Sequence, residues 1–429
     1  MRKHTRSFGA RRFLICGCKY GAGNIGDESI LLGLTRILRR SCPDCDIRVC
    51  TANGDFTRRE LGLDGYGLSR EQTIRALRWA THVLLGGGTL IEDTDHIGYP
   101  LQHNAWLLET ACALGRPVCF AAVGGGRLSP QGKALVARYF GISALHTARN
   151  EQTARLLTDA GIPGDHVRVT ADAAYALLEE EGPAASREEQ CLVGVNAVNE
   201  TCADRYGPQY RELLATALNE FAERSKIPIE FFGSEVRAGD YFDWQANRNV
   251  ASMLHPQVAH KITRGQLVHP LRFIQDLRRF RLIVSMRMHV VMFGAMLGLP
   301  VIPVLRSDKM RFCADELGLS RRLSAENLDP QALRDLMIEA LRRPAPFVAP
   351  HDRVETLRDR AFQTGEHIRD WSATARPAGG GRRAKCLAAF LWKSPASLAV
   401  RKALARTPVL GQVARGCRDL LTGQRRANP

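Results

Sequence analysis

No run of apolar residues in this sequence approaches the roughly 18 to 20 that a membrane-spanning helix needs. Residues 1–12 are basic, but only a short apolar run follows them, not the longer apolar core of a signal peptide. The twelve cysteines are scattered, and the pair Cys42 and Cys45 lacks the second pair that a metal site needs. We therefore expect a cytoplasmic protein without a metal site, neither secreted nor integral to a membrane.

Acidic residues are almost absent from the last part of the chain. The formal net charge is +16, and residues 376–429 hold twelve Lys and Arg against the single acid Asp419. Leu, Phe and Trp are interleaved with these charges, a pattern that suits an anionic bilayer surface. A disordered solubilising tail is the main alternative. Residues 1–375 keep a net charge of only about +5, so we expect membrane association at the inner face and no nucleic-acid binding.

Short apolar runs alternate with segments of helical spacing along most of the 429 residues. This alternation predicts parallel sheets wrapped by helices. The expected strands are 11–18, 47–51, 82–85, 118–123, 144–147, 167–170, 191–196, 229–232, 282–285 and 301–304. The expected helices are 29–38, 70–78, 105–114, 210–225, 290–297 and 352–368.

The length and an acidic, aperiodic stretch predict how these elements divide into domains. We expect an N-terminal α/β domain at 11–178, a linker at 179–190 and a C-terminal α/β domain at 191–345. A helix at 346–375 is expected to pack back across the domains, and 376–429 forms the basic tail.

A glycine-rich segment, Gly21 to Glu28, lies between the first strand and the first helix. Glycines permit a tight turn, and a helix N-terminus offers unpaired amides to a ligand, so we predict that Gly23, Asn24, Gly26 and Asp27 bind substrate. The glycine spacing differs from the dinucleotide-binding fingerprint. The alternative is local: Asp27 caps the helix and Asn24 adopts a left-handed turn.

Two Gly-Gly-Gly runs, 86–88 and 124–126, each close a buried strand at the edge where parallel sheets bind ligands. Gly87, Gly88 and Thr89 are predicted to approach a ligand there. The acids that follow, Glu92, Asp93 and Asp95, are expected to form a solvated lip. Arg149 and Asp172 come after the next two strands, and each points into the crevice or serves as an ion pair or helix cap.

The sequence Ser285-Met286-Arg287-Met288-His289 follows a buried strand and leads into the next helix. Arginine matches carboxylate and phosphate with two hydrogen bonds, and histidine transfers protons near neutral pH. We predict that Arg287 and His289 are catalytic and that Ser285 and Lys309 contact substrate. The alternative is a buried histidine bonded to backbone beside an arginine in an ion pair.

Three stretches together resemble the polysaccharide pyruvyl transferase family: Gly23 to Glu28, the first glycine run, and Ser285 to His289 followed by Gly298-Leu299-Pro300 and Lys309. The resemblance covers about residues 11 to 345. It implies two facing Rossmann-like doubly wound domains, similar to B-type glycosyltransferases. It also implies transfer of a pyruvyl group from phosphoenolpyruvate to a sugar as a ketal, in the biosynthesis of exopolysaccharide or cell-surface polysaccharide.

The resemblance carries roles onto particular residues. Arg287 would bind the anion of phosphoenolpyruvate, His289 would be the general acid or base, and Arg149 and Lys309 would help hold carboxylate and phosphate. Phosphoenolpyruvate is a donor substrate, no cofactor is implied, and the acceptor is a sugar, free or lipid-linked. Asp172 departs from the pattern because the family often has Asp-Pro at this place.

Two other functions remain open at this point. The first is a glycosyltransferase or nucleotide-sugar epimerase of the same architecture, since a fold does not determine its chemistry. The second is a non-catalytic, membrane-associated scaffold for polysaccharide assembly.

Overall fold

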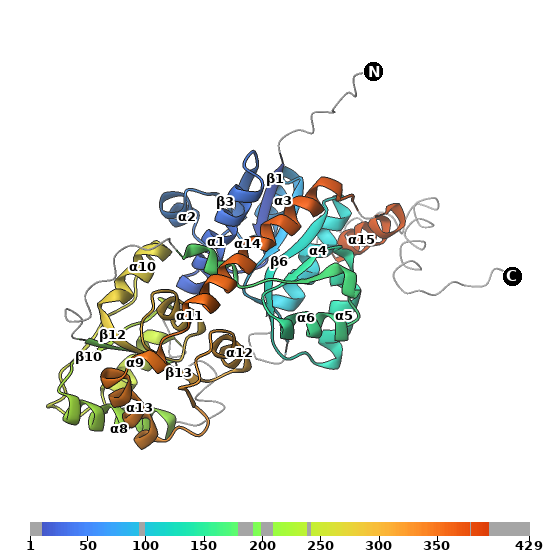
Figure 1. The fold of residues 1–429 in the computed structure, drawn as a ribbon. Helices are drawn as coiled ribbons and strands as arrows, with labels where there is room; N and C mark the ends of the chain where they lie inside the picture. The colour runs from blue at the N-terminus through green and yellow to red at the C-terminus, as the bar shows by residue number, and fades with distance from the viewer. Residues whose placement is uncertain are drawn as a thin grey trace.

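The structure is a computed structural model that describes residues 11–93, 99–178, 192–198, 209–237, 242–377 and 379–393. Two parallel sheets, each wrapped by helices, form two domains that meet along one side (Figure 1). The predicted fold class is therefore confirmed. The predicted linker and most of the basic tail lie outside the described residues, so membrane association of the tail stays a prediction.

The N-terminal domain holds an eight-stranded sheet with the strand order β3-β2-β1-β4-β6-β7-β8, and β5 pairs with β6. All of these pairs are parallel. The strands are β1 (Arg12–Cys16), β2 (Asp46–Cys50), β3 (Asp64–Tyr66), β4 (His82–Gly86), β5 (Thr89–Ile91), β6 (Val118–Gly125), β7 (His146–Ala148) and β8 (Val167–Val169). The helices are α1 (Ile25–Ser41), α2 (Gly54–Leu61), α3 (Arg70–Trp79), α4 (Tyr99–Ala113), α5 (Pro130–Tyr139) and α6 (Glu151–Asp159), with 3-10 turns η1 (Phe140–Ile142), η2 (Gly164–His166) and η3 (Ala173–Leu177).

The C-terminal domain holds a six-stranded parallel sheet with the strand order β11-β10-β9-β12-β13-β14. The strands are β9 (Leu192–Asn196), β10 (Ile229–Phe231), β11 (His260–Ile262), β12 (Phe280–Ser285), β13 (Val301–Leu305) and β14 (Leu323–Ser324). The helices are α8 (Gln209–Ser225), α9 (Asp243–Ala251), α10 (Pro270–Asp276), α11 (Met288–Met296), α12 (Asp308–Glu316) and α13 (Pro330–Arg342), with 3-10 turns η5 (Leu277–Arg279) and η6 (Ala345–Phe347).

One apolar core runs through both domains. It joins α1 of the N-terminal domain to residues of β12 and α11 in the C-terminal domain, for example Ile30, Phe280 and Phe293. Two further cores cover the other face of each sheet. Burial of apolar surface is the main favourable term in folding, so a shared core fixes how the two sheets sit against each other.

Two helices follow the second domain. Helix α14 (His351–Thr374) begins beside α11 and packs on α1 and η3, so it crosses from one domain to the other. Helix α15 (Gly380–Lys393) packs on α4 (Figure 1), where Arg382 donates a hydrogen bond to the carbonyl of Gly141 at 2.9 Å. The first part of the basic tail thus lies on the N-terminal domain.

Several helix boundaries differ from the predicted ones. Helix α1 begins at Ile25, four residues earlier than expected, because Asn24 accepts a hydrogen bond from the Gly26 amide and caps it. Helix α4 begins at Tyr99, six residues earlier than expected. Gly26, Asp27 and Glu28 therefore belong to the first turn of a helix and not to the preceding loop.

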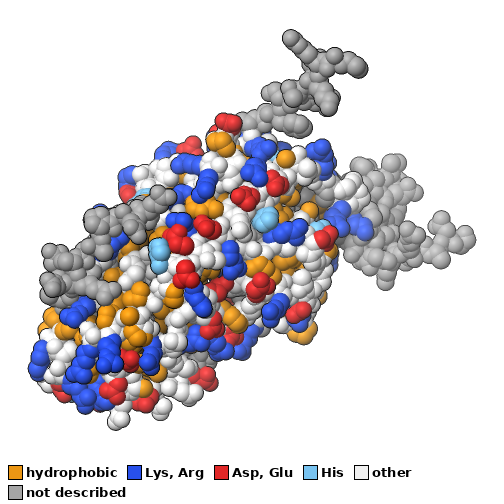
Figure 2. Space-filling view, in the orientation of Figure 1, with side chains coloured by type: hydrophobic (Ala, Val, Ile, Leu, Met, Phe, Trp, Pro, Cys, Tyr) orange, Lys and Arg blue, Asp and Glu red, His pale blue; other side chains and the backbone are white. Residues whose placement is uncertain are grey.

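Basic side chains are unevenly distributed over the surface. Figure 2 shows Lys and Arg gathered at the end of the C-terminal domain that carries β10 and α8. Part of the basic excess outside the tail is therefore local. Among the helices that the structure describes, none is both long and apolar enough to span a bilayer.

Candidate active site

The carboxyl ends of the central strands of both sheets face the boundary between the domains. In doubly wound sheets, ligands bind outside these ends at the point where the strand order reverses. The reversal lies between β1 and β4 in the N-terminal domain and between β9 and β12 in the C-terminal domain. The predicted segments 21–28 and 86–89 leave the first pair, and Ser285 to His289 leaves the second.

The loop before α1 pairs directly with the C-terminal domain. Asn24 and Glu235 form an isolated antiparallel bridge, in which the Ile25 amide donates to the Ser234 carbonyl at 2.9 Å. The Val236 amide donates to the Gly23 carbonyl at 2.8 Å. The backbone at Gly23 to Ile25 thus joins the domains, a role that the sequence analysis did not predict.

The sequence also allowed a local role for Gly21 to Glu28, with Asp27 as the helix cap and Asn24 in a left-handed turn. Both parts of this alternative are wrong. Asn24 has extended backbone angles, φ −107° and ψ 107°, and not left-handed ones, and Asn24 caps α1 in place of Asp27. The left-handed region is occupied by Gly23, at φ 102°, where a Cβ would meet Cγ2 of Val236 at 2.8 Å. Glycine is needed there for both reasons.

Gly26 and His289 bring the first and last sequence motifs together. A Cβ atom added to Gly26 would overlap the imidazole of His289, mainly at Nδ1. The first turn of α1 therefore forms one wall of the histidine site, and only glycine leaves room for the ring. Nothing in the sequence indicated that these two residues, far apart in the chain, would be in contact.

The other side of His289 faces a buried carboxylate. His289 Nε2 lies 3.7 Å from Oδ2 of Asp172, which accepts a hydrogen bond from Nη1 of Arg149 at 3.0 Å. Arg149 Nη2 also donates to the Thr89 hydroxyl at 3.4 Å. Arg149 and Asp172 are each about 5% exposed, so Arg149 lies behind Asp172 and orients it.

Charged neighbours lower the pKa of Asp172 and outweigh the effect of burial. Burial by itself raises the pKa of this carboxyl, but His289 and Arg149 lower it to about 2. Asp172 is therefore ionised at neutral pH, and its Oδ1 caps η3 by accepting from the Ala174 amide at 3.1 Å. Both alternatives stated for this residue, an ion pair and a cap, hold at once, and it also faces His289.

His289 does not fit the alternative of a buried histidine whose ring is bonded to backbone. Its Nε2 is buried and makes no hydrogen bond to any part of the chain that the structure describes. A histidine that served only the core would have both ring nitrogens satisfied. Its Nε2 faces the Asp172 carboxylate instead, and a histidine ring oriented by a carboxylate is suited to proton transfer.

Arg287 is held by an aspartate that the sequence analysis missed. Its Nε and Nη2 atoms contact Oδ1 of Asp243 at 2.8 and 2.7 Å. The second oxygen of Asp243 accepts from the Asn196 side chain and from the amides of Ser234 and Glu235. Asp243 is 0% exposed and Arg287 12% exposed, so the guanidinium is anchored from below with one side toward the crevice.

Ser285 supports the same arrangement from the strand. Its hydroxyl donates to Oδ1 of Asn196 at 3.1 Å and accepts from the Arg287 amide at 3.0 Å. Asn196 ends β9 and Ser285 ends β12, the two strands at the reversal point. Ser285 is thus bonded to its neighbours and fixes the turn that presents Arg287.

The sequence contained no indication of the role of Asp243. As the first residue of α9, it looked like an ordinary helix start.

Asp27 faces the same space from α1. Burial raises its pKa, and His289, the Cys18 thiol, Arg237 and Lys309 oppose this rise in that order. Lys309, in the first turn of α12, and His289 are thus both among the charges that act on Asp27.

The glycines after β4 pack against this region. Gly88 approaches Asp27, since a Cβ added there would lie 4.0 Å from Oδ1, whereas Gly87 is pressed against Ile30 of α1. Asp93 of the expected solvated lip is partly exposed and also accepts hydrogen bonds from Ser129, which caps α5. Asp95 lies outside the described residues.

Glu28 supplies a test of the buried charges near the site. It is 0% exposed, and burial raises its pKa from 4.5 to about 8 despite a hydrogen bond from the Gly21 amide. The folded protein then holds a proton that the unfolded chain has lost between these pH values. Stability is full below about pH 4.5 and falls by up to about 1.4 kcal/mol per pH unit as pH rises toward 8.

Glu28→Gln is expected to reduce this decline, because glutamine does not titrate. The measurement is the free energy of unfolding in urea at about pH 5 and pH 8. Glu71→Gln, at an exposed position on α3, should retain the wild-type decline. An equal decline in Glu28→Gln would contradict the assignment.

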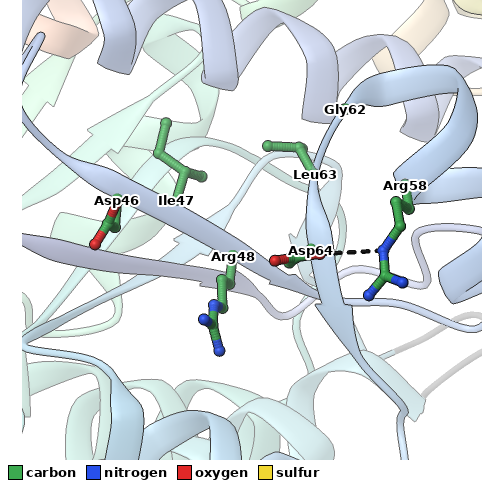
Figure 3. Close-up of a pocket in the computed structure, with 7 residues that line it drawn as sticks. All are labelled: Asp46, Ile47, Arg48, Arg58, Gly62, Leu63 and Asp64. Atoms are coloured by element: carbon green, nitrogen blue, oxygen red, sulfur yellow. Dashed lines mark hydrogen bonds and ion pairs between the residues drawn. The ribbon is translucent and has the colours of Figure 1, made fainter.

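A cavity elsewhere in the N-terminal domain does not compete with this site. It has a volume of about 330 Å³ and lies at the amino ends of β2 and β3, opposite the ligand-binding edge (Figure 3). Arg58 and Asp64, two of its charged residues, form an ion pair at 3.1 Å. We assign no function to it. Across the described ranges, no three His, Cys, Asp or Glu side chains are grouped as metal ligands.

Comparisons with known proteins add a family and a fold. A family model described as polysaccharide pyruvyl transferase matches residues 24–308. No curated protein matches the chain. Among solved structures, the UDP-GlcNAc 2-epimerase of Neisseria meningitidis bound to UDP-GlcNAc is 12% identical and has a TM-score of 0.56, with 83% of this chain and 99% of that chain covered.

Two further structures agree on the fold. S. aureus MnaA with UDP is 12% identical with a TM-score of 0.58, and the match covers 84% of this chain and 95% of that one. Anabaena Alr3699/HepE with UDP-glucose is 12% identical with a TM-score of 0.53, and the match covers 84% of this chain and 98% of that one. At this identity the likeness concerns the architecture alone.

Proposed function

Because this chain belongs to the polysaccharide pyruvyl transferase family, we propose that it moves a pyruvyl group from phosphoenolpyruvate onto two hydroxyls of a sugar. The product is a cyclic ketal on a cell-surface or secreted polysaccharide, or on a precursor of one. The observation that supports this chemistry most directly is the pair Arg287 and His289 at the start of α11, opposite Gly26 of α1.

The reaction requires proton transfers and stabilisation of a doubly anionic donor. One sugar hydroxyl adds to C2 of the enol, and C3 takes a proton to become a methyl group. The second hydroxyl displaces phosphate from C2, which leaves both oxygens on one carbon. Of the two hydroxyl protons, one ends on the methyl group and the other leaves with phosphate. A proton-transfer group and fixed cations are therefore the minimum.

The chain offers a residue for each of these tasks. Arg287 holds the donor's carboxylate or phosphate, with its orientation set by Asp243, and Lys309 is the second cation. His289 moves the protons, and Asp172, which Nε2 faces at 3.7 Å, orients its ring. We assign Arg149 to orienting His289 through Asp172, whereas the resemblance implied direct contact with the donor. The proposal uses no cofactor besides the donor.

The test is release of phosphate from phosphoenolpyruvate in the presence of nucleotide sugars and lipid-linked sugars, with mass spectrometry of the sugar product. We expect release with at least one acceptor and a loss of about a hundredfold or more in His289→Asn. His255→Asn is the matched control, because His255 is exposed and pairs only with Glu223 at 3.1 Å among the contacts described. Phosphate release that is indifferent to His289 would refute the proposal.

The runner-up is a nucleotide-sugar epimerase, which the shared architecture with UDP-GlcNAc 2-epimerases favours. It predicts a change in UDP-GlcNAc itself without any phosphoenolpyruvate. The same assay distinguishes the two functions, since only pyruvyl transfer consumes the donor.

A further inference from the structure

Helix α15 lies against α4 (Figure 1), and the two helices meet at points one turn apart. A Cβ atom added to Gly115, just past the end of α4, would lie 2.8 Å from Nη2 of Arg383 on α15. Three residues before Gly115 stands Cys112, and three residues after Arg383 stands Cys386. Residues three apart share one side of a helix, so this spacing places the two cysteines opposite each other.

The two thiols are enclosed between the helices and hydrogen-bonded to each other. Cys112 is 1% exposed and Cys386 is 8% exposed. Beside them, Arg382 donates to the Gly141 carbonyl at 2.9 Å and so holds the start of α15 on the same domain. Two thiols in contact on separate elements are the arrangement from which a disulfide forms.

Cys386 is the more nucleophilic of the two thiols. The hydrogen bond that the Cys112 thiol donates lowers the pKa of Cys386, although burial opposes this effect. Among the charged neighbours, Glu109 raises the pKa of Cys386, and Arg382 and Arg138 lower it. The same hydrogen bond raises the pKa of Cys112. Because the thiolate is the nucleophile in thiol chemistry, attack on an oxidant begins at Cys386.

The start of α15 gives an oxidant access to the pair. Residues 379–385 are exposed, and a Cβ atom added at Gly379, Gly380 or Gly381 would meet nothing within 4 Å. Glycines weaken the first turn of a helix, and helices near the end of a chain open locally far more often than core elements do. The thiols therefore become reachable while both domains stay folded.

We infer that Cys112 and Cys386 are a redox-sensitive pair whose disulfide locks α15, the first part of the basic tail, onto the N-terminal domain. The oxidant is a disulfide of low molecular weight, such as oxidised glutathione. The Cys386 thiolate attacks one of its sulfur atoms, so that a mixed disulfide forms and one glutathione thiolate leaves. Cys112 gives up its proton and displaces the second glutathione. The two cysteines thus lose two electrons and two protons, and the oxidant gains them as two thiols.

Both states of the pair are accessible in the reducing compartment that the scattered cysteines predict. Disulfides that form under such conditions are transient and regulatory. In the reduced protein α15 is held by packing and by hydrogen bonds such as that of Arg382. In the oxidised protein a covalent bond from Cys386 to α4 is added, so α15 can no longer leave the domain.

The first test detects the bond itself. The reduced full chain is equilibrated with mixtures of reduced and oxidised glutathione, free thiols are alkylated, and tryptic peptides are identified by mass spectrometry. We expect a linked pair of peptides that contain Cys112 and Cys386, about 2 Da lighter than the two thiol peptides together. The amount should rise with the fraction of oxidised glutathione, and dithiothreitol should reverse it.

Cys386→Ser is expected to abolish this linked pair. Cys45→Ser is the matched control, because the Cys45 thiol is more exposed than either member of the pair and lies elsewhere in the domain. It should leave the linkage unchanged. Glutathione adducts on Cys386 without the linked pair, or a linkage that appears only after denaturation, would overturn the inference.

The second test measures the locking of α15 by hydrogen exchange. In the oxidised protein the amides of residues 380–393 should exchange at least about tenfold more slowly than in the reduced protein. The amides of α13 in the other domain should change less than about twofold, and Cys386→Ser should exchange equally under both conditions. Equal exchange of α15 in the oxidised and reduced wild type would overturn the inference.

Neither measurement uses phosphoenolpyruvate or a sugar, so the redox pair and the proposed function fail separately. A linked peptide pair with slowed exchange, but no phosphate release, would leave the redox pair standing and count against pyruvyl transfer. Phosphate release without the linked pair would do the reverse.

Discussion

Replacing Gly26 with alanine is expected to reduce phosphate release from phosphoenolpyruvate by a factor of about a thousand while the protein remains folded. The added methyl group would occupy the position of the His289 ring, and the backbone of α1 is fixed there by its cap and by the bridge to residues 234–236. The imidazole must therefore turn away from Asp172. A shift of about 1 Å in a catalytic group typically costs about a hundredfold or more in rate.

The control for Gly26→Ala is Gly54→Ala. Gly54 is the first residue of α2, and a Cβ there would meet nothing within 4 Å. Alanine should be neutral or slightly stabilising at that position, with full activity. Wild-type kcat in a folded Gly26→Ala protein would mean that the position of His289 does not control the reaction.

Arg287→Lys is expected to raise the KM for phosphoenolpyruvate and to lower kcat/KM by about two to three orders of magnitude. Lysine keeps the charge, but it cannot reach Asp243 with two nitrogens and still present a fork to the donor. Arg281→Lys is the matched control on β12, the strand that precedes Arg287, where an exposed guanidinium donates only to the Leu341 carbonyl among the contacts described.

Asp243→Asn tests the anchoring of Arg287 while leaving the arginine itself unchanged. The side chain keeps its size, but Arg287 loses a buried partner, so stability should fall by about 3 to 5 kcal/mol and activity should fall with it. Unfolding in urea and KM for the donor are measured together. If Asp243→Asn left both quantities at wild-type values, the proposed anchoring of Arg287 would be wrong.

The sequence predicted site residues at strand ends, because a polar side chain just past a buried apolar strand can be recognised without knowing the fold. Alternating apolar runs place parallel strands with buried faces, and polar residues just past such strands lie at the ligand-binding edge whatever the details of the fold. Ser285, Arg287, His289 and Thr89 were predicted as site residues for this reason. The start of α1 was misplaced because an asparagine cap and a glycine in the first turn interrupt the apolar pattern that marks a helix.

The residues that contact Arg287 and His289 could not be found in this way. Asp243 and Asn196 each stand at an ordinary element boundary, and only the pairing of β9 with β12 brings them to Arg287. Asp172 was noticed, but its link to His289 depends on how the two domains meet.

The sequence by itself determined the fold class, the strand ends that carry polar residues, and the arginine and histidine of the second domain. These follow from periodicities of two and 3.6 residues and from the chemistry of single side chains. Tertiary structure alone decided that Gly26 packs against His289, that Arg149 pairs with Asp172, and that Gly23 to Ile25 joins the domains. Each of these contacts links residues that lie more than twenty positions apart in the chain, so no local pattern encodes them.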